Sequence, residues 1–441
     1  MMLAIWGYLI VVVFMLLIMT KKATPFTSLV LVPLVIGLMA GLGSKVGPFG
    51  LAGIKSVAPT VVLLLFAILY FGLMITAGLF DPLVRFILKV VKGDPLKVLV
   101  GTAILAAVVS VDGDGSTTTM IVCSAMIPVY KRLGMKMMDL AVIVILANSI
   151  MNLLPWGGPT ARIIAALGVD EGALLRRILP GMFIAIVWII AVAWIRGLQE
   201  RKRLGIRELD NDDIAAMHAT TSEEDEALLR PKMLWPNFIL TMVLMVLLVF
   251  GGMWGLPKVP ASVLFEIGFA IALLINYRKL SDQQAIINIH GANALQVVTM
   301  VLAAGIFMGI LNESGMSEAI GTSLANWVPS SLGGQWPLVT AIISAPGTFL
   351  LSNDAFYLGV LPILAKTGEQ YGFSAMDIGV ASTVGQAFHL LSPLVGFIYL
   401  LLNLTGVDMG AWQRQAGKWA IGTFLIFLVS MYVFGGVALT R

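Results

Sequence analysis

The sequence is poor in charge, in cysteine and in histidine, and each shortage excludes a class of protein. Only 12% of the 441 residues are Asp, Glu, Lys or Arg, whereas a soluble domain carries about 25%. A single cysteine, Cys123, excludes an internal disulfide. Three histidines without metal-ligand spacing, and without a His-Glu-x-x-His motif, argue against a histidine-based metal enzyme. We therefore expect neither a soluble domain nor an enzyme.

Hydrophobic residues make up 59% of the chain, and its mean hydropathy is +0.96. Because about 20 apolar residues are enough to cross a bilayer, this composition predicts an all-α polytopic membrane protein. The expected spans are 2–20, 25–42, 58–80, 137–168 (interrupted), 179–198, 236–256, 260–277, 292–312, 375–406 (interrupted) and 418–437. The first lacks a basic start and a small-residue cleavage site, so we expect a membrane helix and not a signal peptide.

Two polar turns lie between apolar arms that are too short to cross a membrane. Residues 95–131 turn at DGDGSTT, which begins at Asp112, and residues 337–366 turn at SND, which begins at Ser352. Gly and Asp oppose a continuous helix, and irregular backbone at membrane depth survives only inside protein or beside a cavity. We therefore predict two re-entrant hairpins. An intramembrane aspartate is costly, so these tips are also expected to have a function.

Proline and glycine interrupt two of the expected spans. The first reads NLLPWGGPTAR from Asn152 to Arg162, and the second has His389, Ser392 and Pro393 at the matching place. A straight helix does not continue through two prolines. Each break therefore starts a new half-helix whose positive end attracts an anion, and Arg162 adds a full positive charge.

Basic residues indicate how the spans are oriented. If ten spans alternate from an outside N-terminus, one side receives Lys21, Lys22, Arg85, Lys89, Lys92, Lys97, Lys131, Arg132, Lys136, Arg201, Lys202, Arg203, Arg207, Arg278, Lys279, Arg414 and Lys418. The positive-inside rule makes this side the cytoplasm and places both termini outside. The segment Pro82–Lys92 has basic residues on one face and is expected to lie along the cytoplasmic interface. Residues 201–234, the strongly polar stretch, are expected to be a cytoplasmic linker.

The two halves of the chain share a weak repeat. At an offset of 237 or 238 residues, Gly72-x5-Gly78 recurs as Gly309-x5-Gly315, Met138-Asp139 as Met376-Asp377, and Leu153-Leu154 as Leu390-Leu391. Each half contains five spans, an odd number, so the second half enters the membrane upside down. We predict two inverted repeats, 1–200 and 235–441, each with a hairpin and an interrupted helix, and substrate held between them at the midplane.

The two hairpin tips and the two helix breaks are expected to converge on one site. The candidate substrate-binding residues are Gly115, Ser116, Thr117, Thr118, Asn152, Gly157, Gly158, Thr160, Arg162, Ser352, Asn353, His389 and Ser392. The candidates to face a metal ion or to carry a coupling proton are Asp112, Asp114, Asp354 and His389. Donor groups suit a carboxylate, oxygen ligands suit Mg²⁺ or Ca²⁺, and burial disfavours a charged carboxyl group. We expect no permanently bound cofactor and no nucleic-acid partner.

Five motifs resemble the citrate and divalent-metal/proton symporter family, CitMHS, of the ion transporter superfamily. They are FAILYFG at 66–72, GLFDPLV at 78–84, KGDPLK at 92–97, DGDGSTT at 112–118 and NLLPWGGPTAR at 152–162, with LSNDAFYLGVLP in the second half. The resemblance implies a bacterial inner-membrane transporter that takes up citrate complexed with a divalent metal, driven by protons. It also implies an elevator-type mechanism, with a scaffold and a moving transport domain, and a homodimer in the lipid membrane.

The residues leave other functions open. Sodium-coupled dicarboxylate relatives carry Ser-Asn-Thr at both tips, whereas this chain has Gly115-Ser116-Thr117 and Ser352-Asn353-Asp354. The alternatives are a proton- or sodium-coupled carrier of free di- or tricarboxylates, a cation/proton antiporter, a channel and an intramembrane protease. A cation-only site has little use for Arg162, and an intramembrane aspartyl protease places its two aspartates on separate helices. There are also structural alternatives. Arg162 can extend to the outer membrane interface, and His389 and Asn152 can serve only as hydrogen-bonding contacts between helices.

Overall fold

The computed structural model describes residues 2–20, 22–91, 93–206, 227–250, 259–327 and 329–440, and within these ranges it contains helices and no strand. The first-half helices are α1 (Met2–Met19), α2 (Pro25–Met39), α3 (Val46–Thr76), α4 (Asp81–Val91), α5 (Pro95–Val109), α6 (Gly115–Leu133), α7 (Met137–Met151), α8 (Gly158–Leu167) and α9 (Glu171–Leu204). The second-half helices are α12 (Leu234–Phe250), α13 (Ala261–Asn276), α14 (Leu280–Glu313), α15 (Met316–Trp327), α16 (Ser330–Gly333), α17 (Trp336–Leu350), α18 (Leu361–Gln370), α19 (Ala375–Thr383), α20 (Gln386–His389), α21 (Gly396–Thr405) and α22 (Met409–Val433). Short turns of 3₁₀-helix are η1 (Gly43–Lys45), η2 (Ser110–Asp112) and η3 (Pro231–Met233), and η5 (Asp354–Val360) is a π-helix.

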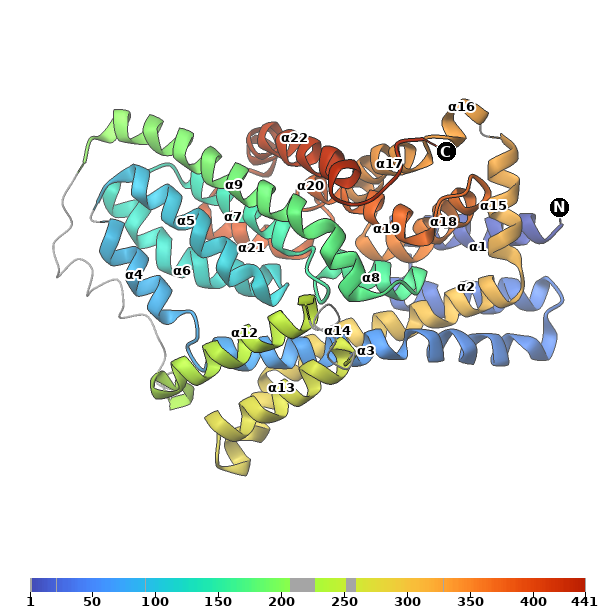
Figure 1. Cartoon of the computed structure of the whole chain (residues 1–441), viewed down its shortest axis with the longest axis horizontal. Coiled ribbons are helices and arrows are strands. Elements are labelled where there is room, and N and C mark those ends of the chain that lie inside the picture. The colour runs from blue at the N-terminus through green and yellow to red at the C-terminus, as the bar shows by residue number, and fades with distance from the viewer. Residues whose placement is uncertain are drawn as a thin grey trace.

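The helices form two groups that face each other (Figure 1). Along the lower side, α3 and α14 run side by side, and α13 packs on α3. Above them lie the two helix pairs α5–α6 and α17–α18, with the long helices α9 and α22 over the upper edge. The predicted all-α class is confirmed, and each expected hairpin is a helix–turn–helix unit.

In the described part of the chain, six helical stretches are long and apolar enough to cross a membrane: Gly43–Thr76, Pro95–Asp112, Glu171–Leu204, Pro231–Leu248, Leu280–Glu313 and Met409–Val433. Shorter apolar helices include α2, α7, α13, α17 and α21. Several helices extend beyond the spans expected from hydropathy. The clearest case is α9, which was expected at 179–198 and extends from Glu171 to Leu204. Both ends remain helical because Asp170 caps the first turn and charged residues in the last turns have hydrogen-bond partners.

Two ion pairs connect the helix α9 with α7 and with α19. Arg196 of α9 forms an ion pair with Asp139, in the first turn of α7, and Arg177 of α9 lies 2.9 Å from Asp377, in the first turn of α19. Asp139 and Asp377 are the aspartates that the sequence matched at an offset of 238. Both aspartates therefore pair with arginines of the same helix, one within the first half and one across the two halves.

Both expected helix interruptions are observed. The chain leaves helical geometry between α7 and α8, and again between α20 and α21. Proline opens α8 because its missing N–H is not needed in the first helical turn. Of the expected linker 201–234, residues up to Leu204 complete α9, and residues 207–226 lie outside the described part of the chain.

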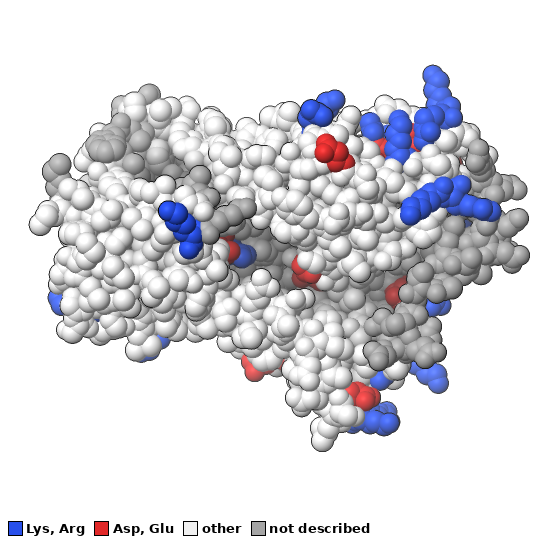
Figure 2. All heavy atoms as spheres, turned by 180° about the vertical axis from the view of Figure 1, so that it is seen from behind, with Lys and Arg blue, Asp and Glu red and all other residues white. Residues whose placement is uncertain are grey.

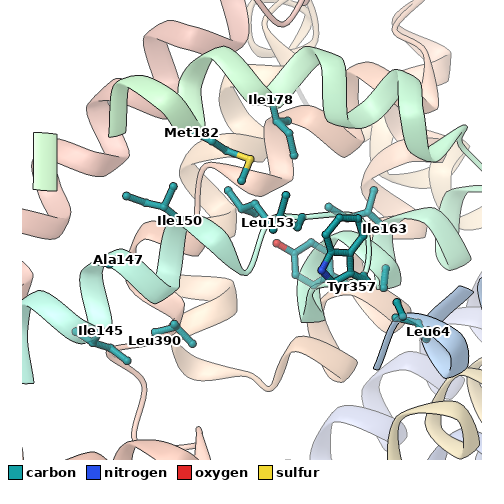
Figure 3. Close-up of a cluster of buried hydrophobic side chains, with 14 of the residues drawn as sticks. Leu64, Ile145, Ala147, Ile150, Leu153, Ile163, Ile178, Met182, Tyr357 and Leu390 are labelled. Carbon is teal, nitrogen blue, oxygen red and sulfur yellow. The ribbon is translucent and has the colours of Figure 1, made fainter. Parts of the chain in front are cut away.

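A buried apolar cluster connects the two halves. Figure 3 shows side chains from both halves in this cluster, including Leu64, Ile145, Ala147, Ile150, Leu153, Ile163, Ile178, Met182, Tyr357 and Leu390. All ten are less than 5% exposed. Because closely packed side chains transmit displacement of one element to the next, the first helix break and the second hairpin are held in fixed relative positions.

Candidate functional site

A cavity of about 250 Å³ lies where the two hairpin turns meet the two helix breaks. Its lining residues are Gly113, Asp114, Gly115, Asn152, Gly158, Arg162, Ser352, Asn353, His389, Leu390, Leu394, Val395 and Phe397. Pockets for drug-sized molecules measure about 300–1,000 Å³, so this one suits a small ligand. Eight of the residues selected from the sequence line it, and all four expected elements contribute.

The first hairpin turn is fixed by the carboxylates of Asp112 and Asp114. Asp114 caps α6, because its side chain accepts hydrogen bonds from the backbone N–H groups of Ser116 (3.2 Å) and Thr117 (2.9 Å). Asp112 accepts from the N–H of Asp114 at 3.0 Å and is buried beneath the turn. The two aspartates therefore differ in position: Asp114 lines the cavity, whereas Asp112 supports the turn.

Two glycines let this turn approach the helix break and the second half. Gly113 has φ +77°, a left-handed conformation that favours glycine. At Gly115, an added Cβ atom would lie 2.1 Å from the ring of Phe397, at the start of α21. The indole of Trp156 also donates to the carbonyl of Val111 at 2.7 Å, which binds the turn to the break after α7.

The first helix break presents backbone and amide groups around the start of α8. The side-chain oxygen of Asn152 accepts from the N–H of Gly158 at 2.9 Å, and Thr160 donates to the carbonyl of Leu153 at 2.7 Å. At Gly157 an added Cβ would lie 2.0 Å from the carbonyl oxygen of Asn152, so a larger residue does not fit without movement. The positive end of the α8 dipole faces the cavity side of this break.

An ion pair joins the two halves beside the cavity. Nε of Arg162 lies 2.6 Å from Oδ1 of Asp354, and its Nη1 donates to the carbonyl of Gly158 at 2.6 Å. The two side chains are 14% and 15% exposed. The sequence suggested Arg162 for an anion and Asp354 for a metal or a proton, and the structure pairs them. In this conformation the arginine charge is balanced by the carboxylate.

The second hairpin and the second break are connected by amide and imidazole groups. Gln386 donates to the side-chain oxygen of Asn353 at 3.1 Å and to the hydroxyl of Tyr357 at 2.8 Å. Nδ1 of His389 donates to the carbonyl of Thr348 at 2.7 Å, because a carbonyl can only accept. The neutral His389 ring then carries its lone pair on Nε2.

The remaining residues selected from the sequence do not line the cavity; they are Asp112, Ser116, Thr117, Thr118, Gly157, Thr160, Asp354 and Ser392. Ser116 is exposed, and Thr118 is buried and donates to Ser110. The sequence reasoning did not select Gln386 or the lining residues Gly113, Leu390, Leu394, Val395 and Phe397. Gln386 could have been selected because it is an amide side chain within the apolar run 375–406. Nothing in the sequence distinguishes the apolar lining residues from other apolar residues.

The described part of the chain contains no group of three or more His, Cys, Asp or Glu side chains that could hold a metal ion. Mg²⁺ and Ca²⁺ take six or more oxygen ligands, which include carboxylate, amide and backbone oxygens as well as water.

The fold is that of a membrane transporter. The crystal structure of the YdaH transporter of Alcanivorax borkumensis, described as having an unusual topology, superposes with a TM-score of 0.59 and 16% sequence identity, covering 89% of this chain and 88% of that one. The chain belongs to the CitMHS citrate transporter family, whose profile matches residues 14–385. It is therefore a multi-pass membrane transporter and not an enzyme.

Two Bacillus subtilis (strain 168) proteins are similar over nearly their whole length. The "Citrate transporter" is 47% identical over 435 residues, covering 98% of this chain and 99% of that protein. The "Mg(2+)/citrate complex secondary transporter" is 44% identical over 440 residues and covers 100% of both.

Proposed function

We propose that the protein is a secondary transporter that takes up citrate complexed with a divalent metal ion in symport with protons. The cavity between the hairpin turns and the helix breaks carries this proposal, because it combines a small volume with a cationic side chain and amide, hydroxyl and backbone groups. The similarity to a Mg(2+)/citrate complex transporter supports the same substrate.

Charge arithmetic favours the complex over the free anion. Citrate with three ionised carboxylates keeps one negative charge once a divalent cation is bound. The guanidinium of Arg162 and the positive end of α8 suffice for one charge, whereas a free trianion would leave buried charge unpaired. In this proposal Gly115, Asn152, Gly158, Ser352 and Asn353 hydrogen-bond the citrate.

The metal travels as part of the substrate. The described residues hold no cluster of metal-binding side chains, so the citrate carboxylates supply most of the oxygen ligands. Asp114 and His389, with its lone pair on Nε2, are the cavity groups proposed to face the cation. Mg²⁺ and Ca²⁺ are the proposed ions, and no permanent cofactor is required.

The ion pair Arg162–Asp354 suggests how a proton and the anion bind together. While Asp354 is ionised, it competes with the substrate for Arg162. Protonation of Asp354 ends that competition and leaves the arginine charge for a citrate carboxylate. We propose Asp354 as a coupling group, because this exchange makes tight citrate binding depend on a bound proton.

The element order supports two inverted repeats, 1–200 and 235–441. The helix α14 ends at Glu313, which is 237 residues after the end of α3 at Thr76, and the two hairpins and the two broken helices follow in the same sequence. We propose that the hairpins are re-entrant and move with the broken helices as an elevator relative to α3 and α14, in a homodimer.

The charge distribution supports a cytoplasmic side at the end of the molecule that bears α4 and the last turns of α6 and α9. On the face that Figure 2 shows, most of the visible Lys and Arg side chains lie toward the right, which corresponds to the left end of Figure 1. The last turn of α9 alone contains Arg201, Lys202 and Arg203. We propose the bacterial inner membrane with both termini outside.

Uptake of labelled citrate into proteoliposomes tests the substrate. With an inward proton gradient, uptake is expected with Mg²⁺ or Ca²⁺ and not with a chelator. Equal uptake with chelator would leave a carrier of free tricarboxylates. Metal–proton exchange without citrate, unchanged by Arg162→Ala, would instead indicate a cation antiporter.

A further inference from the structure

Trp156 belongs to the first helix break and is 3% exposed, but it does not line the cavity. Its indole N–H donates to the carbonyl of Val111 at 2.7 Å. Val111 lies in the turn η2 that follows α5, and carbonyl groups at the end of a helix have no partner within the helix. A buried indole N–H in turn needs an acceptor. One hydrogen bond therefore satisfies both groups and attaches the first hairpin turn to the break.

The first hairpin turn also packs directly against the indole of Trp156. At Gly113, an added Cβ atom would lie 3.2 Å from Cδ1 of Trp156 and 3.2 Å from Cα of Gly157, so the backbone of the turn is already close to the ring. Gly113 lines the cavity, as do the next two residues, Asp114 and Gly115. The position of the indole therefore sets where the turn presents its groups to the cavity.

The same indole completes an aromatic cluster with the helices on the lower side of Figure 1. Its ring lies 5.3 Å from that of Phe71 in α3, in a stacked arrangement, and 5.0 Å from that of Phe265 in α13, edge to face. These two rings are 5.8 Å apart, and Tyr70 lies 5.3 Å from the first and 5.8 Å from the second. All four side chains are buried. Trp156 is therefore the ring that the helix break contributes to a cluster on α3 and α13.

We propose that Trp156 is a positioning residue that couples the first hairpin turn to the surface of α3 and α13, so that substrate binding and docking of the turn on this surface stabilise each other. This role rests on the proposed function, in which the broken helices move relative to α3. When the aromatic contacts are lost, the indole can tilt, and its hydrogen bond to Val111 and its packing against Gly113 both weaken. Coupling between two sites is reciprocal, so a substrate that orders the turn also favours docking.

Hydrogen–deuterium exchange of the full-length protein in lipid nanodiscs tests this coupling without a substrate. The amide hydrogens of Asp114, Ser116 and Thr117 form hydrogen bonds within the turn, at 3.0, 3.2 and 2.9 Å, and report its local opening. Phe71→Leu changes a residue that does not line the cavity. It is expected to speed exchange of these amides by about 2- to 13-fold, the equilibrium equivalent of one aromatic pair.

The matched control for this measurement is Phe66→Leu. Phe66 lies in the same helix as Phe71, and its ring packs against Phe269 of α13 at 6.2 Å. The substitution therefore disturbs the packing of α3 on α13 to a similar extent and is expected to leave exchange in the turn unchanged. The coupling would be overturned by wild-type exchange in Phe71→Leu, or by an equal increase in both variants.

Kinetics of citrate uptake test whether the coupling reaches the substrate. Trp156→Phe keeps a ring beside Phe71 and removes the donor to Val111. The KM for citrate with Mg²⁺ is expected to rise by about 2- to 13-fold, the value of one hydrogen bond, with little change in uptake at saturating citrate. Adding Phe71→Leu to Trp156→Phe is expected to raise the KM little further, because both changes act through the same bond. A fully additive increase would contradict the role of Trp156.

The exchange and uptake measurements separate the role of Trp156 from the proposed function. If the wild-type protein takes up no citrate while Phe71→Leu still loosens the turn, the proposed substrate fails and the attachment of the turn to α3 and α13 stands. If citrate uptake is normal and Phe71→Leu changes neither the exchange of the turn nor the KM, the positioning role fails and the transporter remains.

Discussion

Replacing Arg162 by alanine is expected to weaken citrate binding and to destabilise the protein, and the structure allows the two effects to be separated. The guanidinium lines the cavity and also holds Asp354, with Nε and Oδ1 2.6 Å apart and both side chains at or below 15% exposure. Losing a charged partner of this kind costs about 2–5 kcal/mol in binding. The KM for citrate is therefore expected to rise by at least about 30-fold.

The stability effect comes from Asp354 and is reversible by a second substitution. Arg162→Ala leaves a nearly buried carboxylate unpaired, which costs about 1.5–3 kcal/mol, the value of a hydrogen bond to a charged group. Adding Asp354→Asn removes that charge, so the double variant is expected to regain most of its thermal stability while its uptake remains poor. A double-mutant cycle on the melting of the purified protein gives the coupling.

Arg177→Ala is the matched control for this experiment. Arg177 also pairs with an aspartate of the second half, Asp377, at 2.9 Å, but it does not line the cavity. It is therefore expected to lower stability and to leave the KM for citrate unchanged. Additive stability effects of Arg162→Ala and Asp354→Asn, or a wild-type KM in Arg162→Ala, would refute the reasoning.

Three further predictions concern the coupling, the turn and the long helix α9. Asp354→Asn alone is expected to keep citrate uptake and to lose its dependence on a proton gradient, measured in proteoliposomes with and without an imposed pH difference. Gly115→Ala is expected to destabilise the protein by about 1–3 kcal/mol and to slow uptake, because the new methyl group would lie 2.1 Å from the ring of Phe397. The control is Gly47→Ala, whose methyl group would meet nothing within 4 Å. It is expected to stabilise helix α3 by about 0.5–1 kcal/mol. Asp139→Ala leaves Arg196 without its partner and is expected to lower the melting temperature without changing the KM.

Local chemistry made the helix breaks predictable. Two prolines and two glycines between Leu154 and Thr160 cannot continue a helix, and the structure ends α7 at Met151 and restarts at Gly158. The same holds for the first hairpin turn, because Gly113 and Asp114 supply a left-handed residue and a helix cap. These features depend on neighbouring residues, which the sequence lists directly.

Helix lengths were less predictable, because hydropathy does not register the partners of charged residues. The charged end of α9 remains helical as Glu200 accepts hydrogen bonds from Arg203 and from the backbone of Lys136. The partner of Arg162 was also beyond sequence reasoning. Asp354 lies 192 residues away, and the sequence placed Asp112, Asp114 and Asp354 at one expected site with Arg162 without showing which of them pairs with it.

The sequence by itself determined that the chain is a helical membrane protein with two polar turns and two broken helices, because composition and local backbone preference act over a few residues. Only the tertiary structure decided that these four elements share one cavity, that Asp114 lines it while Asp112 lies beneath it, and that Arg162 is paired across the two halves. Those outcomes depend on how distant helices pack, and packing is a property of the whole chain.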